Sequence, residues 1–319
     1  MNRRVVLKVL VTDPMHQTGI KELSSFTELA VVNRPTRAQF LGQLADTDVL
    51  VCRSSVKVDA EAFDVANHLR AVIRAGNGLD NIDVTRAEAD GVELSSIPSP
   101  GVNAVAEFVI GHLLGLSRHI VEADRQVREG QWNKALLCGT ELGGRTLGIV
   151  GCGKIGSRVA ELAQGFGMHT LASVARQDPA RRTELAARGI ELCPLEELIE
   201  RSDAISVQVP GAPETRNLID AALLERVRQG CMVVDVSRAG VVNHHALLAG
   251  LNSGRLAGVA VDVHAEESGI PVLAQHERAV LTPHLGGSTD EAQERIAREV
   301  VSRIRRLECE GRVAHGNHA

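Results

Sequence analysis

A strand, a glycine-rich turn and a helix follow one another near the middle of this 319-residue chain. The apolar run Thr146–Val150 leads into Gly151-Cys152-Gly153-Lys154-Ile155-Gly156, and an amphipathic stretch begins at Lys154. In a G-x-G-x-x-G turn the first glycine makes the bend, the second lets the backbone approach a pyrophosphate, and the third lets helix and strand pack closely. The phosphates would lie at the helix N-terminus, where free N–H groups favour negative charge. The context predicts a dinucleotide-binding turn, with a purely structural turn as the alternative.

The composition excludes several classes of protein. Hydrophobic residues make up 44% of the chain and charged residues 24%, which is typical of a globular protein long enough for two domains. A net charge of -5 gives no electrostatic reason to expect nucleic acid or an anionic membrane as a partner. No apolar run approaches the roughly 20 residues that span a bilayer. The six cysteines are scattered without metal-ligand spacing, so we expect reduced thiols, no metal and a cytoplasmic location.

Short β-rich runs alternate with helical ones before residue 101, a pattern typical of parallel α/β folds. Two prolines and a glycine in Ile97–Gly101 suit a domain crossing better than the interior of a strand. In this first part we expect four strands and at least two helices: strands at Val5–Val11, Val49–Cys52, Ala71–Arg74 and Val92–Ser95, and helices at Gly19–Ser24 and Arg37–Leu44.

The rest of the chain predicts a second, larger α/β unit. One long helical stretch runs from Val105 to about Glu129, and a final helix runs from Thr289 to about Glu308. Six strands are expected between them, the number in a doubly wound nucleotide domain: Thr146–Val150, Thr170–Val174, Ala204–Val209, Met232–Val236, Gly258–Val263 and Val280–Leu281. We therefore expect two doubly wound parallel-sheet domains, a Rossmann-type nucleotide domain (residues 101–285) inserted into a flavodoxin-like substrate domain (residues 1–100 plus 286–319).

Three ionisable residues each follow a predicted strand of the second unit: Arg238, Glu267 and His284. Taken singly each would be structural, but ligands bind at the carboxyl ends of strands in open α/β sheets. Hydride transfer to a ketone leaves an alkoxide that needs a proton, and a histidine can supply it near neutral pH. A neighbouring carboxylate favours the imidazolium, and a guanidinium can polarise the carbonyl and grip a substrate carboxylate.

Several spaced motifs resemble the D-specific 2-hydroxyacid dehydrogenase family, and within it the 3-phosphoglycerate dehydrogenases. They are Arg53–Val58, Arg74–Asp83, Gly139–Leu142 and Thr282–Thr289. The resemblance implies that Arg238, Glu267 and His284 are catalytic, and that the chain forms a homodimer built on the nucleotide domain. It also implies substrate contacts at Arg53, Ser54, Asn77 and Gly78, and cofactor contacts at Gly151, Gly153, Lys154, Ile155, Gly156, Val174, Arg176, Pro210, Thr215, Ser237, Asp262 and Gly286.

The chain departs from the family pattern at the end of the second nucleotide-domain strand. Val174 stands where an acidic residue usually binds the adenosine ribose, and Arg176 follows it. Loss of the carboxylate removes repulsion toward a 2′-phosphate, and an arginine can pair with one, so NADP is favoured over NAD. The alternative is a solvated Arg176 with NAD still accepted. Because the chain ends soon after the last helix, we also expect no C-terminal regulatory domain.

The combined prediction is an NAD(P)-dependent dehydrogenase of small D-2-hydroxyacids. Hydroxypyruvate or glyoxylate reduction is the close alternative to phosphoglycerate oxidation. Phosphite or formate oxidation on the same fold ranks lower, because formate-type members carry a glutamine where this chain has Glu267. A nucleotide-sensing binding protein is the alternative from another class. The apolar helix Val105–Leu116 would serve either a dimer interface or internal packing.

Overall fold

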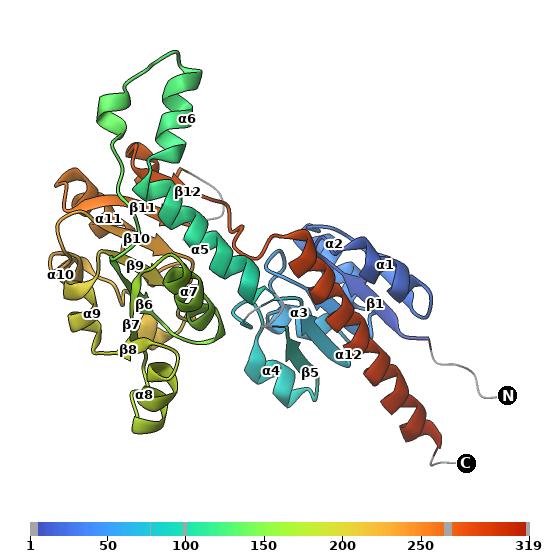
Figure 1. Ribbon diagram of the computed structural model, residues 1–319. Coiled ribbons are helices and arrows are strands. Elements are labelled where there is room, and N and C mark those ends of the chain that lie inside the picture. The colour runs from blue at the N-terminus through green and yellow to red at the C-terminus, as the bar shows by residue number, and fades with distance from the viewer. Residues whose placement is uncertain (1–5, 77, 98–100, 265–269, 317–319) are drawn as a thin grey trace. The chain divides into compact units, whose positions relative to one another are not determined.

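The computed structural model describes residues 6–76, 78–97, 101–264 and 270–316 (Figure 1). The chain divides into two compact units. Unit 1 comprises Met1–Gly101 and Ser288–Ala319, and unit 2 comprises Val102–Gly287. Each unit has its own parallel sheet and its own hydrophobic clusters.

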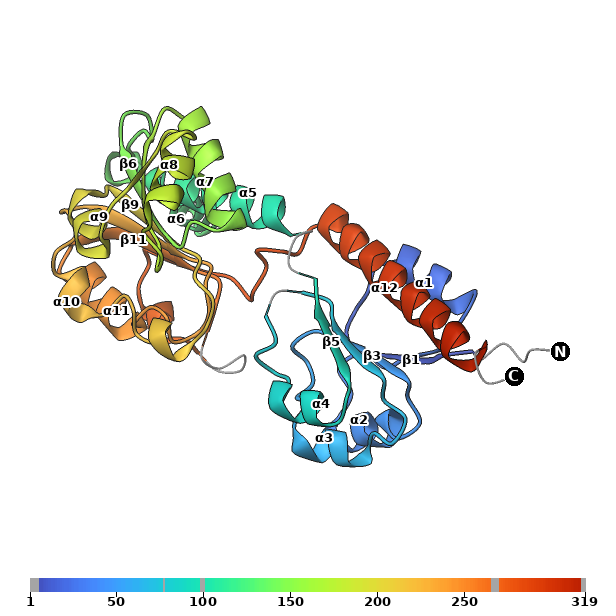
Figure 2. The same cartoon turned by 90° about the horizontal axis from the view of Figure 1, so that it is seen from below.

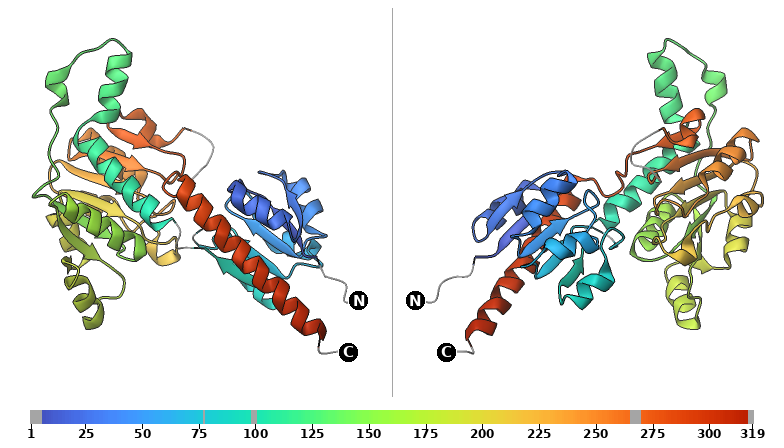
Figure 3. Two further views of the ribbon diagram at one scale, coloured as in Figure 1. Left: turned by 45° about the vertical axis from the view of Figure 1, so that its right-hand side comes forward. Right: turned by 180° about the vertical axis from the view of Figure 1, so that it is seen from behind.

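Unit 1 is built on five described parallel strands in the order β2-β1-β3-β4-β5, the flavodoxin-like order. The last helix lies against α1, where Val300 and Ile304 join Leu23 in one buried cluster (Figure 3). Helices α2, α3 and α4 supply the cluster on the other face. The elements are β1 (Lys8–Val11), α1 (Gln17–Ser24), β2 (Glu28–Val31), α2 (Arg37–Leu44), β3 (Val49–Cys52), α3 (Ala60–Val65), β4 (Ala71–Arg74), α4 (Val84–Ala89), β5 (Glu93–Ser96) and α12 (Asp290–Gly316).

Unit 2 contains seven described parallel strands in the order β12-β11-β10-β9-β6-β7-β8, labelled in Figure 1 and seen from below in Figure 2. Chain order reverses between β6 and β9, which makes the switch point of a Rossmann fold. Helices α5, α7 and α8 pack on one face, and α9, α10 and α11 on the other. The elements are α5 (Val102–Ser117), α6 (Ile120–Arg128), β6 (Thr146–Val150), α7 (Lys154–Gly165), β7 (His169–Ser173), α8 (Pro179–Ala186), β8 (Ile190–Leu192), α9 (Leu195–Arg201), β9 (Ala204–Val207), α10 (Ala221–Leu224), β10 (Cys231–Asp235), α11 (His244–Asn252), β11 (Leu256–Val261) and β12 (Ala279–Leu281), with 3₁₀ turns η1 (Lys134–Leu137), η2 (Pro213–Thr215) and η3 (Val272–Gln275).

The predicted fold class, two doubly wound α/β domains, is confirmed. The strand count was wrong in both units, because β2 and β8 were not predicted. Both lie at the edge of a sheet, where strands are short and one side needs no apolar neighbour. β2 is only partly buried and β8 has three residues, so neither shows a strong apolar pattern.

The single helix predicted from Val105 to Glu129 is also wrong. Helix α5 ends at Ser117, and His119 adopts a left-handed conformation (φ 53°) before α6 begins at Ile120. The two helices meet at a bend of 60°. In the described part of the chain no single helix meets the length and hydropathy criteria for crossing a membrane, and only this bent pair meets them jointly.

Candidate active site

The glycine turn has the geometry that its sequence predicts. Gly151 has a φ of +91°, and a Cβ there would lie 2.7 Å from Val209 Cγ1. A Cβ at Gly156 would collide with the carbonyl oxygen of Gly151, so this position needs a glycine. Gly153 is the N-cap residue of α7, and a Cβ there would meet no described atom within 4 Å. No side chain caps α7 at Gly153, so the positive end of the helix dipole lies where an anion such as a pyrophosphate would bind.

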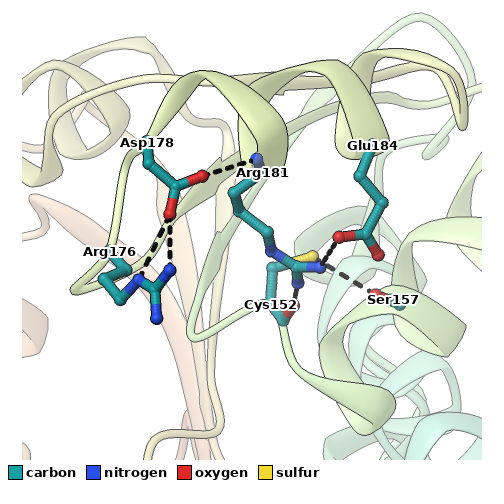
Figure 4. Close-up of polar contacts among 6 residues, drawn as sticks. All are labelled: Cys152, Ser157, Arg176, Asp178, Arg181 and Glu184. Carbon is teal, nitrogen blue, oxygen red and sulfur yellow. Dashed lines mark hydrogen bonds and ion pairs between the residues drawn. The ribbon is translucent and has the colours of Figure 1, made fainter.

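Two arginines lie beside this turn, after strand β7 (Figure 4). The strand ends at Ser173, one residue before Val174. Arg176 has 91% of its side chain exposed and donates to Asp178 Oδ2 at 2.9 Å. Arg181, on the first turn of α8, donates to the carbonyl oxygen of Cys152 within the glycine turn and pairs with Glu184. The two guanidinium groups could therefore face an anion bound near the end of β7.

Asp178 partly neutralises this positive charge. Its Oδ1 accepts the backbone N–H of Arg181 at 2.8 Å and so caps α8, while Oδ2 faces Arg176. The backbone hydrogen bond from Arg181, and then the Arg176 guanidinium, hold the pKa of Asp178 below its usual value. Burial raises the pKa of the Cys152 thiol in the adjacent turn, so it is a poor nucleophile.

Arg238 lies in the loop after β10, and a buried carboxylate shapes that loop. Asp235 is fully buried at the end of the strand and accepts hydrogen bonds from the backbone N–H and the hydroxyl of Ser237. Half-buried Arg238 donates from Nη1 to the carbonyl oxygen of Ser237 at 2.8 Å. The loop after β9 passes alongside, because a Cβ on Gly211 would lie 3.2 Å from Arg238 Cβ.

Thr215 closes the β9 loop that carries Pro210. Its hydroxyl donates to the carbonyl oxygen of Pro210 at 2.7 Å and accepts the N–H of Ala212 at 2.9 Å. These bonds hold the chain in a turn at the carboxyl edge of the sheet, beside the switch point between β6 and β9. The turn therefore lies on the side of the sheet where a dinucleotide would bind.

A second buried carboxylate fixes the loop that carries His284. Asp262, 2% exposed, accepts from the Thr282 hydroxyl at 2.6 Å and from the N–H groups of Leu285 and Gly286 at 2.7 and 2.9 Å. His284 is exposed and adopts a left-handed backbone conformation with a φ of 58°. Non-glycine residues rarely adopt this conformation, and such strain persists only where surrounding bonds enforce it.

The sheet order places these loops at neighbouring strand ends. Strands β10, β11 and β12 are adjacent, so Arg238, Asp262 and His284 emerge at one carboxyl edge of unit 2. The predicted catalytic Glu267 lies outside the described residues, as does the predicted substrate residue Asn77. Among the described residues, no group of three or more His, Cys, Asp or Glu side chains is arranged to hold a metal ion.

One predicted substrate residue of unit 1, Arg53, lines a small pocket at the carboxyl edge of that unit. Arg53 follows β3; its backbone N–H donates to buried Asp13 at 2.7 Å, and its Nη1 donates to Gln293 at 2.9 Å. The pocket lies between Asp13, His16, Arg53 and Gln293 and is small. Burial lowers the pKa of Arg53, although Asp13 opposes the effect.

The remaining predicted substrate residues lie on loops of the same unit. Ser54 is exposed, and Gly78 has a φ of 78° that favours glycine. Asn81 connects this region, since it donates to the carbonyl oxygen of Arg53 at 2.8 Å and accepts from Arg74 Nε at 2.9 Å. The backbone around Arg53 is therefore held in place from within unit 1.

Sequence reasoning missed Arg181, Asp13 and Gln293 as site residues. Asp178-Pro179 signals a helix start, with Asp as N-cap and Pro at the first position, and this signal would have placed Arg181 in the first turn of a helix after β7. Asp13 could have been noticed because it lies two residues after the end of the first strand. Gln293 lies on α12, and nothing local predicts that it contacts Arg53, 240 residues away.

Comparisons with known proteins identify the family of the chain. The model of the D-isomer specific 2-hydroxyacid dehydrogenase NAD binding domain matches residues 110–286. D-3-phosphoglycerate dehydrogenase of Mycobacterium leprae (strain TN) is 38% identical over 299 residues, covering 93% of this chain and 56% of that protein. The chain thus spans little more than half the length of that relative.

Solved structures of similar fold cover nearly the whole chain. A glyoxylate reductase from Paecilomyes thermophila has a TM-score of 0.85 at 28% identity, covering 96% of this chain and 97% of that one. A Polaromonas sp. JS6 66 protein, described as a D-isomer specific 2-hydroxyacid dehydrogenase, has a TM-score of 0.88 at 27% identity with the same coverage. The family resemblance drawn from the sequence motifs is confirmed.

Proposed function

Since the chain belongs to the D-isomer specific 2-hydroxyacid dehydrogenase family, we propose that it is an NAD(P)-dependent enzyme that interconverts a small D-2-hydroxyacid and its 2-oxoacid. The observation that carries the proposal is the carboxyl edge of unit 2, where the glycine turn and the loops bearing Arg238 and His284 emerge from one sheet. The nicotinamide cofactor, when bound, accepts or donates the hydride. Gly151, Gly153 and Gly156, with the first N–H groups of α7, would hold its pyrophosphate.

The side chains have separate tasks in the proposed reaction. His284 gives a proton to the alkoxide oxygen during reduction and takes it back during oxidation. Glu267 stabilises the charged imidazole, and Arg238 orients the substrate carboxylate and polarises the carbonyl. The buried carboxylates of Asp235 and Asp262 fix the two loops that carry Arg238 and His284, which is the preorganisation that such chemistry requires.

The substrate is a 2-hydroxyacid of the phosphoglycerate or glycerate type. Identity to phosphoglycerate dehydrogenases supports the first, with Arg53 and the loop of Asn77 and Gly78 as substrate contacts. A specific observation favours the second candidate, hydroxypyruvate or glyoxylate reduction. Arg53 already donates a hydrogen bond to Gln293, and its backbone N–H donates to buried Asp13. The pocket of unit 1 is therefore small and not strongly positive.

The preferred cofactor is NADP(H). Val174 removes the carboxylate that would repel a 2′-phosphate, and Arg176 with Arg181 supplies two guanidinium groups beside the glycine turn. Asp178 works against this preference because it pairs with Arg176. We therefore expect a moderate rather than an absolute preference for NADPH.

The active form is a homodimer in the cytoplasm. Helix α5 buries Val109, Ile110 and Leu113 within unit 2, so its apolar face serves internal packing. Exposed apolar side chains instead gather on residues 120–136, where Trp132 is 82% and Leu136 73% exposed. Such a surface suits a second copy of the chain. Replacing Trp132 and Leu136 with Glu should yield a monomer in analytical ultracentrifugation, whereas a dimer unchanged by the substitutions would refute this interface.

A panel of 2-oxoacids tests the proposal. Hydroxypyruvate, glyoxylate and phosphohydroxypyruvate are each supplied with NADH and with NADPH, and oxidation of the nicotinamide is followed by absorbance. Turnover of at least one acid, faster with NADPH, supports the enzyme assignment. Binding of the reduced cofactor without turnover of any acid would instead favour a nucleotide-sensing protein.

A further inference from the structure

Three buried polar atoms without partners lie at the carboxyl edge of unit 2. Asp235 Oδ2, His244 Nε2 and His264 Nδ1 each lack a hydrogen-bond partner in the structure as described. Leaving such a group unsatisfied costs about 1–3 kcal/mol, so three in one place call for an explanation. The proposed reaction gives the two histidines of this group no role.

The three side chains are neighbours. His244 is on the first turn of α11, with 15% of its side chain exposed, and its Nε2 lies 3.7 Å from Asp235 Oδ2. The rings of His244 and His264 are 6.3 Å apart in an edge-to-face arrangement. A protonated His244 would form an ion pair with the fully buried carboxylate of Asp235.

Each end of this cluster holds one of the two loops proposed to be catalytic. The other oxygen of Asp235 accepts from both the N–H and the hydroxyl of Ser237, next to Arg238. At the far end, His264 Nε2 lies 3.0 Å from the carbonyl oxygen of Thr282, which also accepts the N–H of His284 at 3.0 Å. One carbonyl thus fixes both the His264 ring and the left-handed backbone of His284.

We propose that Asp235, His244 and His264 form a positioning network that couples the Arg238 loop to the His284 loop. The inference rests on the proposed function, because it takes Arg238 and His284 as the groups that act on substrate. His244 holds the carboxylate of Asp235 in place and so fixes the turn at Ser237. His264 donates to Thr282 and so fixes the backbone of His284. The edge-to-face contact between the two rings holds the Arg238 loop and the His284 loop in a fixed position relative to each other.

The network predicts different kinetic signatures for its two histidines. His244→Leu releases the Arg238 loop, so we expect KM for the 2-oxoacid to rise and kcat/KM to fall about 10- to 100-fold. His264→Phe keeps a flat ring but cannot donate to Thr282, so kcat should fall by a similar factor with a smaller change in KM. His244→Gln retains an N–H donor toward Asp235 and should stay within about threefold of the wild type.

His245→Leu is the matched control, because His245 is the next residue on the same helix and is exposed. It should leave every constant unchanged. NADPH affinity, measured by fluorescence, should change far less than kcat/KM in all variants, since the glycine turn that would hold the pyrophosphate is untouched. The variant carrying both His244→Leu and His264→Phe should lose less activity than the product of the single losses, because the two act as one unit.

The proposal is overturned if folded His244→Leu and His264→Phe both retain wild-type kcat/KM, or if their losses simply multiply. Equal losses in His244→Leu and His244→Gln would also overturn it, since bulk rather than the donor would then matter. If circular dichroism shows that His244→Leu is unfolded, Asp235→Asn is used in its place. The same rise in KM for the 2-oxoacid is expected.

Failure of the proposed function gives a different result. If the network alone is wrong, the wild type still turns over a 2-oxoacid and His284→Ala still abolishes turnover, while the network variants behave as wild type. If the proposed function is wrong, the wild type turns over no 2-oxoacid, or His284→Ala remains active, and the inference falls with it.

Discussion

Two stretches of the carboxyl edge in unit 2 are built in opposite ways. At β10–β12, the buried carboxylates of Asp235 and Asp262 tie down the loops that carry Arg238 and His284. After β7, the charged groups are on the surface, and Arg176 has 91% of its side chain exposed. The loops that carry the groups proposed to act on reacting atoms are thus fixed by buried hydrogen bonds, whereas Arg176, proposed to select the cofactor, lies in solvent. Substitutions should therefore have large effects at the first stretch and small ones at the second.

The largest effect is expected at Arg238. Arg238→Ala removes the group that orients the acid and polarises its carbonyl, so kcat/KM for the 2-oxoacid should fall roughly 10³-fold. The affinity for NADPH should stay within about twofold, because Arg238 is not among the residues proposed to hold the cofactor. Steady-state kinetics with fluorescence titration measure both quantities, and a retained kcat/KM would remove Arg238 from the mechanism.

Asp262 tests whether the fixed loop matters in itself. Asp262→Ala leaves the Thr282 hydroxyl and the N–H groups of Leu285 and Gly286 without their acceptor, so the free energy of unfolding should fall by about 2–4 kcal/mol. A shift of the His284 loop should also lower kcat about 100-fold.

The control for Asp262 is Asp220→Ala, which removes an N-cap from α10, away from the His284 loop. It should cost about 1 kcal/mol of stability and leave kcat unchanged. Denaturant unfolding and kcat of both variants make the comparison. Equal kcat in Asp262→Ala and the wild type would show that the loop needs no anchoring.

The sequence predicted the glycine turn and the ends of the strands in unit 2 well. The glycine turn was predicted residue by residue, because the positive φ of Gly151 and the close approach at Gly156 are local demands on backbone shape. Strand ends could likewise be read from buried apolar runs such as β10. Arg238, Glu267 and His284 were predicted at one edge because parallel strands share an edge, and the structure describes Arg238 and His284 there.

The features that the sequence did not predict depend mainly on contacts between residues far apart in the chain. Nothing local indicates that Arg181 reaches the carbonyl oxygen of Cys152, or that His244 faces Asp235. The edge strands β2 and β8 carry too little apolar pattern to be recognised. The left-handed residue His119 that separates α5 from α6 has no glycine signal, since the conformation is one that histidine adopts only occasionally.

At the exposed stretch the expected effect is smaller. Arg176→Ala removes a charge proposed to face the 2′-phosphate, so kcat/KM with NADPH should fall about tenfold, as expected for one charged hydrogen bond. The value of kcat/KM with NADH should change by less than about twofold. Steady-state kinetics with both cofactors measure the ratio of the two kcat/KM values. An equal fall of kcat/KM with NADH would mean that Arg176 does not contact the 2′-phosphate.

The smallest effect is expected at Asp178. Asp178→Asn keeps a side chain that can cap α8 but removes the charge that pairs with Arg176. Because an exposed ion pair is worth at most about 1 kcal/mol, preference for NADPH over NADH should rise about two- to fivefold. A preference that moves toward NADH would contradict the assigned charge balance.

The most direct test of the account is a single-turnover measurement on the wild type and on His284→Ala. Each protein is loaded with NADPH and mixed with the best 2-oxoacid from the panel, and oxidation of the bound nicotinamide is followed by stopped flow. We expect both to bind NADPH equally and His284→Ala to oxidise it roughly 10²- to 10⁴-fold more slowly. Equal rates in the two proteins would contradict the claim that His284, held on the edge of unit 2, supplies the proton.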